Sequence, residues 1–410
     1  MKNVLSTRVN LPYLEELGST DEEYFEDEYI EFLQEEKFPK YVSLVNDILD
    51  SYDDVENLKE FTVDVPSFEG GNPERWFEFA LSSTKIERIE INLTYFFNSD
   101  SGFYTFPRLI ANMAGLPGLN SLKELCLKYI HIDDMDFDFL VTKLVSLEKL
   151  SIENSERLKK VVVNGGVEKL EELEICDCLY LESVEVSNVM NLVCLKCWGS
   201  MEYKYILRLH NVPKLTHFQT SGNLTNSIEQ VLSGISVSVR DQLLRLKLAT
   251  NPLCMSIRDI PKLKNLKHME LLIDMHERDS AFSFFQLIEA CPLLEKLEVN
   301  FWGYRCDMVK DGEPEEWYSQ RHKHLKTVTF SGYVGWPIEL EFAIYILKSA
   351  VRLEEFIVES CDRYDTAKKE AAAAHAREKF PPLLRKFKPF FVVQPESPNL
   401  HYVAKKKLAI

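Results

Sequence analysis

Apolar residues recur along the chain in one short pattern, LxxLxL, in which Ile, Val, Phe or Met replaces some of the leucines. Successive copies begin 22 to 36 residues apart. Their first residues are Leu58, Ile86, Leu122, Leu147, Leu170, Leu192, Leu215, Leu243, Leu266, Leu294, Leu325 and Leu353. Self-similarity with a period of about 20 to 50 residues is typical of a repeat protein in which each copy supplies one supersecondary unit.

Within each copy, the last two apolar residues predict a short β-strand. In the copy that begins at Leu170, Leu173 and Ile175 are two residues apart and therefore point to one face. Glu172 and Glu174 alternate with them and point to the other face. Stacked copies bury the apolar residues as one ladder, each buried side chain contributing roughly 1.5 to 3 kcal/mol. We therefore predict an α/β leucine-rich-repeat solenoid, a ribonuclease-inhibitor-like horseshoe with a curved parallel β-sheet.

The segments that connect these strands differ along the chain. Between Leu147 and Leu192 additional copies begin at Leu158 and Leu181, so the step shortens to 11 or 12 residues. The short gap between apolar runs leaves no room for a helix, and strand or extended turn is expected on the convex side there. The remaining convex side is expected to be helical where the units are longer.

Four segments carry helical signals. Residues 38–52 place Tyr41, Val42, Val45, Ile48 and Leu49 on one side, which predicts an amphipathic helix that caps the first repeat. Apolar spacing predicts further helices over residues 280–290 and 339–350. The alanine-rich segment 367–380 predicts a helix that Pro381 and Pro382 end.

Residues 15–36 contain 11 acidic residues and no Lys or Arg, interleaved with aromatic side chains. The simpler interpretation is a solvated loop or frayed helix, as is usual for a run of like charges. The alternative is an acidic, aromatic docking segment.

Composition and charge narrow the classes of partner. The chain has 48 Lys and Arg against 65 Asp and Glu, a formal net charge of -17 that repels a phosphate backbone, so no nucleic-acid partner is expected. No apolar window is long enough to span a membrane, and the N-terminus does not resemble a secretory signal. Nine cysteines, an odd number, favour a reducing compartment. We therefore expect a cytoplasmic or nuclear protein with no membrane partner.

Candidate chemistry is sparse. The pairs Cys176 with Cys178 and Cys194 with Cys197 suggest zinc, but no histidine lies at finger-like spacing from either pair. Buried strand cysteines are the simpler interpretation, and no metal or cofactor is expected. The sequence contains no phosphate-binding loop, HExxH motif or nucleophile elbow, so we do not expect an enzyme.

The residues between the apolar strand positions predict a row of polar side chains on the concave surface, as in any solenoid. The predicted row is Lys149, Ser151, Glu172, Glu174, Lys196, Trp198, His217, Gln219, Arg245, Lys247, His268, Glu270, Lys296, Glu298, Thr327 and Thr329. The candidate partner-binding residues are Lys149, Glu174, Lys196, Trp198, Gln219, Arg245, Lys247, Glu270 and Glu298. Trp198 and Arg245 are of the residue types that dominate protein interfaces.

Three segments resemble a known family. Residues 324–335, 339–350 and 353–358 are similar in order to the strand, glycine turn, helix and final strand of the FBD-type region of plant F-box/leucine-rich-repeat proteins. Residues 38–49 resemble the helix that joins the F-box to the repeats. Val4-Leu-Ser-Thr-Arg8 resembles the end of an F-box, although Val9 stands where the family has Trp and the upstream F-box helices are missing.

This resemblance implies the substrate-recognition part of an SCF-type ubiquitin ligase receptor, whose protein partner is a candidate ubiquitination substrate. A Skp adaptor and cullin are implied only if a longer product carries an F-box. The resulting divisions are an F-box remnant and acidic segment (1–37), the solenoid (38–320), FBD-type repeats (321–360) and a helical, basic tail (361–410). A small-molecule-dependent sensor, a stand-alone binding module and a relic without a partner remain alternatives.

Overall fold

The computed structural model describes residues 4–8, 38–66, 73–94, 104–105, 115–199, 206–221, 228–250, 260–274, 282–302, 321–360, 366–388, 391–393 and 402–406. The chain divides into two compact units, Met1–Leu215 and Thr216–Ile410, here called unit 1 and unit 2. The acidic segment predicted at residues 15–36 lies outside the described residues.

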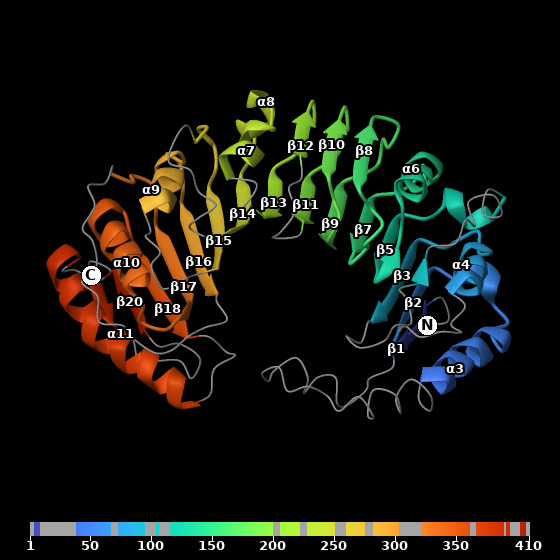
Figure 1. Ribbon diagram of the computed structural model, residues 1–410, viewed down its shortest axis with the longest axis horizontal. Coiled ribbons are helices and arrows are strands. Elements are labelled where there is room, and N and C mark those ends of the chain that lie inside the picture. The colour runs from blue at the N-terminus through green and yellow to red at the C-terminus, as the bar shows by residue number, and fades with distance from the viewer. Residues whose placement is uncertain are drawn as a thin grey trace. The chain divides into compact units, whose positions relative to one another are not determined.

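Unit 1 is built on a parallel sheet (Figure 1). Its strands follow one another in chain order: β1 (Val4–Arg8), β2 (Glu60–Pro66), β3 (Arg88–Thr94), β5 (Glu124–Lys128), β7 (Lys149–Glu153), β9 (Glu172–Cys178) and β11 (Cys194–Gly199). The helices are α3 (Phe38–Asp50), η2 (Val55–Asn57), α4 (Pro73–Leu81), η3 (Pro117–Asn120) and α6 (Asp134–Lys143), with a two-stranded sheet of β4 (Tyr104–Thr105) and β6 (Ile130–His131). The predicted capping helix is confirmed, and its Val42, Val45 and Leu49 are buried.

The half-length repeats, predicted as strand or extended turn, form strands β8 (Lys160–Asn164) and β10 (Ser183–Ser187), and β12 (Ile206–His210), which was not predicted, joins them in a second, three-stranded parallel sheet. The residues that follow these strands, Gly165, Asn188 and Asn211, all have positive φ, a conformation that glycine and asparagine tolerate best. The amide of Asn188 donates to the His210 carbonyl at 3.2 Å, and the amide of Gly165 donates to the Ser187 carbonyl at 3.0 Å. The same turn is therefore repeated and hydrogen-bonded from one repeat to the next.

Helix α6 closes one edge of this small sheet. The Asp133 carboxylate accepts from the amides of Met135 and Asp136 and caps the helix. The Asp134 carboxylate accepts from the amides of Lys159 and Lys160 at 2.9 and 2.8 Å. Lys159 precedes β8 and Lys160 begins it, so both amides lie at the edge of the small sheet. The Asp134 side chain accepts the hydrogen bonds that a further strand would otherwise accept.

Unit 2 continues the same scheme with one parallel sheet and an antiparallel end (Figure 1). In sheet order the strands are β13 (His217–Ser221), β14 (Arg245–Thr250), β15 (His268–Asp274), β16 (Lys296–Trp302), β17 (Thr327–Tyr333), β18 (Glu355–Ser360), β20 (Tyr402–Lys406) and β19 (Phe391–Val393). The helices are α7 (Ile228–Ser233), α8 (Val237–Arg240), α9 (Phe282–Glu289), α10 (Pro337–Ser349) and α11 (Thr366–Phe387). Helices α9 and α10 confirm two of the predicted helices, whereas the antiparallel strands β19 and β20 carry no repeat pattern.

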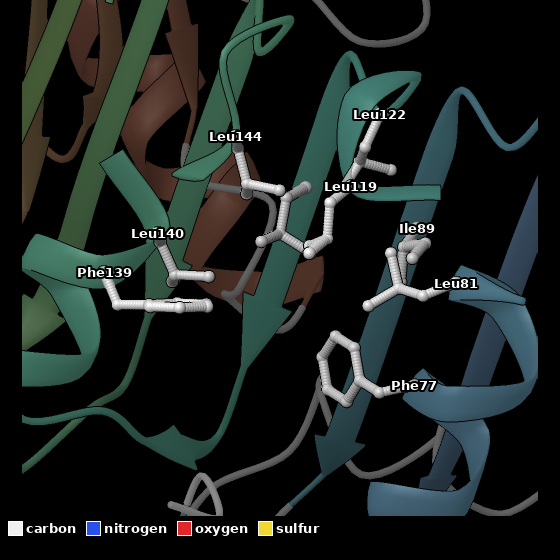
Figure 2. A pocket seen from close by; sticks show the side chains of 9 residues that line it. Phe77, Leu81, Ile89, Leu119, Leu122, Phe139, Leu140 and Leu144 are labelled. Carbon is white, nitrogen blue, oxygen red and sulfur yellow. The ribbon is translucent and has the colours of Figure 1, made fainter. Parts of the chain in front are cut away.

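The apolar ladder forms the core of each unit. All twelve residues that begin a copy of the pattern are buried, as are Leu173 and Ile175. Figure 2 shows how helices complete this core in unit 1: Phe77 of α4 and Phe139 of α6 point toward the same region beside the strands. The gap left among these apolar side chains is only about 10 Å³, at the lower limit of the roughly 10 to 15 Å³ that one water needs. The side chains that alternate with the ladder lie on the opposite face of each sheet, here called the polar face.

The prediction that Pro381 and Pro382 end the C-terminal helix is wrong, because α11 continues through both to Phe387. Each proline removes one backbone donor, which costs helix stability. Packing of the residue just before the prolines offsets this cost. The Phe380 ring lies against Tyr333 and Phe356, with ring centroids 5.5 and 5.4 Å apart, and is fully buried.

The segment Val4–Arg8, which resembles the end of an F-box, is part of the sheet of unit 1. It forms strand β1, which pairs in parallel register with β2, Val4 opposite Glu60 and Arg8 opposite Asp64. These residues therefore extend the repeat sheet in this structure.

Replacing one inward residue should disrupt several repeats together. Leu173 is fully buried between Leu150 and Leu195 of the neighbouring strands. In Leu173→Asp a carboxylate would be buried without a partner, so we expect cooperative unfolding of unit 1 well below the wild-type melting temperature. Circular dichroism measures this, with Glu171→Asp at an exposed position as the control. A melting curve identical to wild type would refute the assigned strand phase.

Substituting two glycines of nearly the same φ distinguishes the stability cost of backbone strain from that of steric overlap. Gly332 has φ 76° and an added Cβ would lie 2.1 Å from the Phe301 carbonyl oxygen, whereas Gly166 has φ 73° and no atom within 4 Å of that position. Gly166→Ala should therefore cost only the left-handed strain of about 1 to 2 kcal/mol. Gly332→Ala should destabilise considerably more, measured by urea unfolding. Equal losses in the free energy of unfolding of the two variants would mean that β16 and β17 move apart to accommodate the added methyl group at no cost.

Two buried histidines should make the fold sensitive to acid. Burial lowers the pKa of both His131 and His322 to about 4. The His131 Nδ1 accepts from the Glu156 amide at 3.2 Å, and the His322 Nε2 lies 2.8 Å from the Tyr345 hydroxyl. Below pH 6.5 the unfolded chain takes up protons that the folded chain does not, so stability should fall between about pH 6.5 and 4, by up to about 3 kcal/mol for each group.

Urea unfolding of wild type and His322→Gln across that pH range measures the difference. The variant should show a shallower loss, whereas His210→Gln, at an exposed position, should follow wild type. Parallel curves for wild type and His322→Gln would contradict the expectation.

Candidate functional site

The polar face of unit 1 carries a group of side chains centred on Glu174. Its carboxylate accepts from Lys196 Nζ at 2.6 Å, Lys149 Nζ at 3.2 Å and Ser151 Oγ at 3.1 Å. These residues come from three adjacent strands, β7, β9 and β11, whose register places Ser151, Glu174 and Lys196 opposite one another. Glu174 is 12% exposed in this position, so the network is held close to the sheet.

The charges in this group stabilise one another. Burial opposes ionisation of Glu174, but the hydrogen bonds and charges of Lys196 and Lys149 outweigh it and lower its pKa below the usual value. Burial likewise disfavours the charged form of Lys149, and its bonds to Glu172 and Glu174 raise its pKa instead. All three groups are therefore charged at neutral pH, and their positions are fixed by mutual contacts.

Trp198 lies beside this group at an irregularity in the sheet. The register between β9 and β11 shifts between Cys197 and Gly199, and Asp177 on β9 has φ 53°. The Trp198 side chain is half-buried. The predicted alternation thus holds up to Cys197, and the bulge sets the local geometry around the tryptophan.

A second group surrounds a hollow in the polar face of unit 2, here called the unit 2 hollow. Its volume is about 160 Å³. Parallel register brings its residues together from three neighbouring strands. The lining consists of His217, Phe218 and Gln219 of β13, Arg245, Leu246 and Lys247 of β14, and His268 and Glu270 of β15. Four of the nine candidate residues, Gln219, Arg245, Lys247 and Glu270, therefore meet here.

Hydrogen bonds connect the hollow to the next strand. Arg245 Nε donates to His268 Nδ1 at 3.1 Å, and His268 Nε2 lies 2.8 Å from a Glu298 carboxylate oxygen. Because arginine can only donate, His268 Nδ1 must accept, which leaves the proton on Nε2 and the ring neutral. Burial disfavours the charged form of Glu298, but hydrogen bonds from Lys296 and His268 lower its pKa. Glu298 therefore holds His268, and His268 in turn orients Arg245; this chain of hydrogen bonds is here called the relay.

The structure separates the candidate residues into two groups. Lys149, Glu174, Lys196 and Trp198 lie in unit 1, and the other five lie in unit 2, with Glu298 one strand beyond the hollow. Sequence reasoning placed His217 and His268 in the row but did not select them as site residues. Their shared position with Arg245, the first residue of each strand, is the signal that could have identified them.

The cysteines lie in the strands, as expected from their pattern. Cys178 and Cys197 are buried in the core, and burial raises the pKa of Cys176 and Cys178 to about 12. The thiols are therefore protonated and poor nucleophiles. Across the described ranges, no three His, Cys, Asp or Glu side chains are grouped as metal ligands would be. None of the helices in the described part of the chain is both long and apolar enough to cross a membrane.

A family comparison agrees with this arrangement. The profile of a family described as "At1g61320/AtMIF1, LRR domain" matches residues 74–381. The chain belongs to this leucine-rich-repeat family. The match begins at helix α4 and ends within α11, so the leucine-rich-repeat domain includes both groups of polar residues. A comparison with curated proteins gave no match.

Membership supports the role of a protein-interaction scaffold, because leucine-rich-repeat domains generally bind other proteins through surfaces formed by several repeats. The two groups described above likewise span several repeats. Each is built from side chains of three or more consecutive strands.

Removing the central carboxylate of unit 1 should cost more than removing an exposed one. In Glu174→Gln, two lysines and Ser151 lose a charged acceptor, and we expect a loss of roughly 1 to 3 kcal/mol in the free energy of unfolding. Glu185→Gln removes the carboxylate of an exposed pair with Arg208 and should cost about 0 to 1 kcal/mol. Urea unfolding compares them, and equal values would mean that the Glu174 network is not cooperative.

Proposed function

We propose that the chain is a protein-binding scaffold that forms the substrate-recognition part of an F-box-type ubiquitin ligase receptor. The observation that carries the proposal is the pair of polar groups on the strand faces of a leucine-rich-repeat domain. The similarity of residues 324–358 to an FBD-type region supports the ligase context. The partner in that context is a ubiquitination substrate, and the role of the chain is selection rather than catalysis.

The polar groups are suited to recognition because they are already ordered. Glu174 and Glu298 each accept from two basic or imidazole side chains, which fixes Lys149, Lys196 and Arg245 in place. A surface whose side chains are held before binding loses less conformational entropy when a partner docks. Such a surface also favours partners whose charges match its own.

Recruitment of a Skp adaptor and cullin is proposed only for a longer product that carries an F-box. A stand-alone binding module is the alternative when no such product exists. A small-molecule sensor is less well supported, because the unit 2 hollow of about 160 Å³ is smaller than the roughly 300 to 1,000 Å³ of pockets that bind drug-sized ligands.

Affinity purification of the tagged 410-residue chain from plant extract, followed by mass spectrometry, tests the proposal. We expect one protein to be recovered with wild type and to be reduced at least tenfold with Trp198→Ala, at unchanged melting temperature. Tyr180→Ala, an exposed aromatic in the turn after β9, is the matched control and should retain the partner.

The outcomes separate the alternatives. Skp adaptor and cullin recovered with the partner support the ligase role, and increased turnover of that partner on overexpression would strengthen it. A partner recovered without them supports a stand-alone module, and no partner contradicts the scaffold role. Loss of melting temperature in Trp198→Ala with binding intact would mean that Trp198 is part of the core.

A further inference from the structure

Arg245 differs from its neighbouring cations on the polar face of unit 2. Lys247 pairs with Glu270 at 2.6 Å, and Lys296 pairs with Glu298. Arg245 instead donates its Nε to the neutral ring of His268 at 3.1 Å. Within the described residues, its guanidinium has no carboxylate partner, and the two terminal amino groups have no protein acceptor.

The position of Arg245 makes this charge accessible. Arg245 is the first residue of β14, is exposed, and lines the unit 2 hollow. His217 and His268 are its register neighbours on the two adjacent strands. Among the described residues that line the hollow, Arg245 and Lys247 are cationic and Glu270 is anionic, in a chain whose net charge is -17.

The size of the hollow restricts what can enter it. About 160 Å³ is less than the roughly 300 to 1,000 Å³ of pockets that bind drug-sized ligands, so the hollow suits a small group such as one side chain. Gln219 lines the same hollow and supplies an amide that can donate to an anion. An anionic group of side-chain size therefore matches both the charge and the volume.

We propose that Arg245 binds the carboxylate of one Asp or Glu side chain of the protein partner, in a two-bond pairing through its terminal amino groups. A planar guanidinium matches a carboxylate in this way, and such charged pairs are stronger than neutral hydrogen bonds. His268 and Glu298 act as positioning residues, because the relay through His268 occupies Nε and orients the rest of the guanidinium toward the hollow. The inference rests on the proposed protein-binding function and names the chemistry that this site selects.

Selection from phage displaying random 12-residue peptides tests the proposal with the full chain. Wild type should enrich peptides with Asp or Glu at one fixed position, and changing that residue to Asn or Gln in a synthetic peptide should weaken binding roughly 10- to 100-fold. Arg245→Glu should instead enrich Lys or Arg at that position. Arg385→Glu, at an exposed position on α11, is the matched control and should keep the acidic preference.

Two further variants test geometry rather than charge. Arg245→Lys keeps the charge but loses the paired donors and should recover only part of the affinity. His268→Ala should reduce the difference between acidic and amide peptides without changing the melting temperature by more than a few degrees.

Each result has a distinct meaning. Bound peptides with no fixed acidic position, or an acidic preference that persists in Arg245→Glu, would overturn the role of Arg245 while leaving protein binding intact. Failure of wild type to bind any peptide, together with no partner in the affinity purification, would instead count against the scaffold role itself.

Discussion

The fold of each unit depends on the stacking of inward apolar side chains from one strand to the next. In unit 1, Leu150, Leu173 and Leu195 are register neighbours, and in unit 2 Leu246 and Met269 continue the same contact. No single strand can bury these residues by itself, so each repeat depends on its neighbours for the hydrophobic contribution that keeps it folded. The helices and the small outer sheet complete this core from one side and leave the other face of each sheet to polar side chains.

This constraint also determines the chemistry of the polar face. Strands about 4.8 Å apart in fixed register bring equivalent positions of successive repeats into contact. Opposite charges on adjacent strands therefore pair, as Lys196 does with Glu174 and Lys247 with Glu270. Arg245 lacks a carboxylate on the neighbouring strand, because the residue opposite it is His268. The proposed recognition site thus lies where the repeats do not satisfy each other.

Sequence patterns predicted the elements whose signal is local. The two-residue alternation around Leu173 predicted both the strand and its buried face, because alternation follows from backbone geometry alone. The short steps at Leu158 and Leu181 predicted strand or extended turn where β8 and β10 form, since about five residues cannot form a helix and two turns. The nine candidate site residues followed from the same alternation, which places a residue on a face but does not say which neighbours it contacts.

Contacts between distant residues decided the rest. Helix α11 passes through Pro381 and Pro382 because Phe380 packs on Tyr333 and Phe356, residues that no local pattern associates with it. The hollow and its relay depend on the register of β13 to β16, in which residues more than 20 positions apart become neighbours. The sequence by itself determined the strands that carry the repeat pattern, their inward faces and the identity of the polar residues. Only the tertiary structure decided which of those residues satisfy one another, because hydrogen bonds and charge pairs depend on distances that the order of residues does not specify.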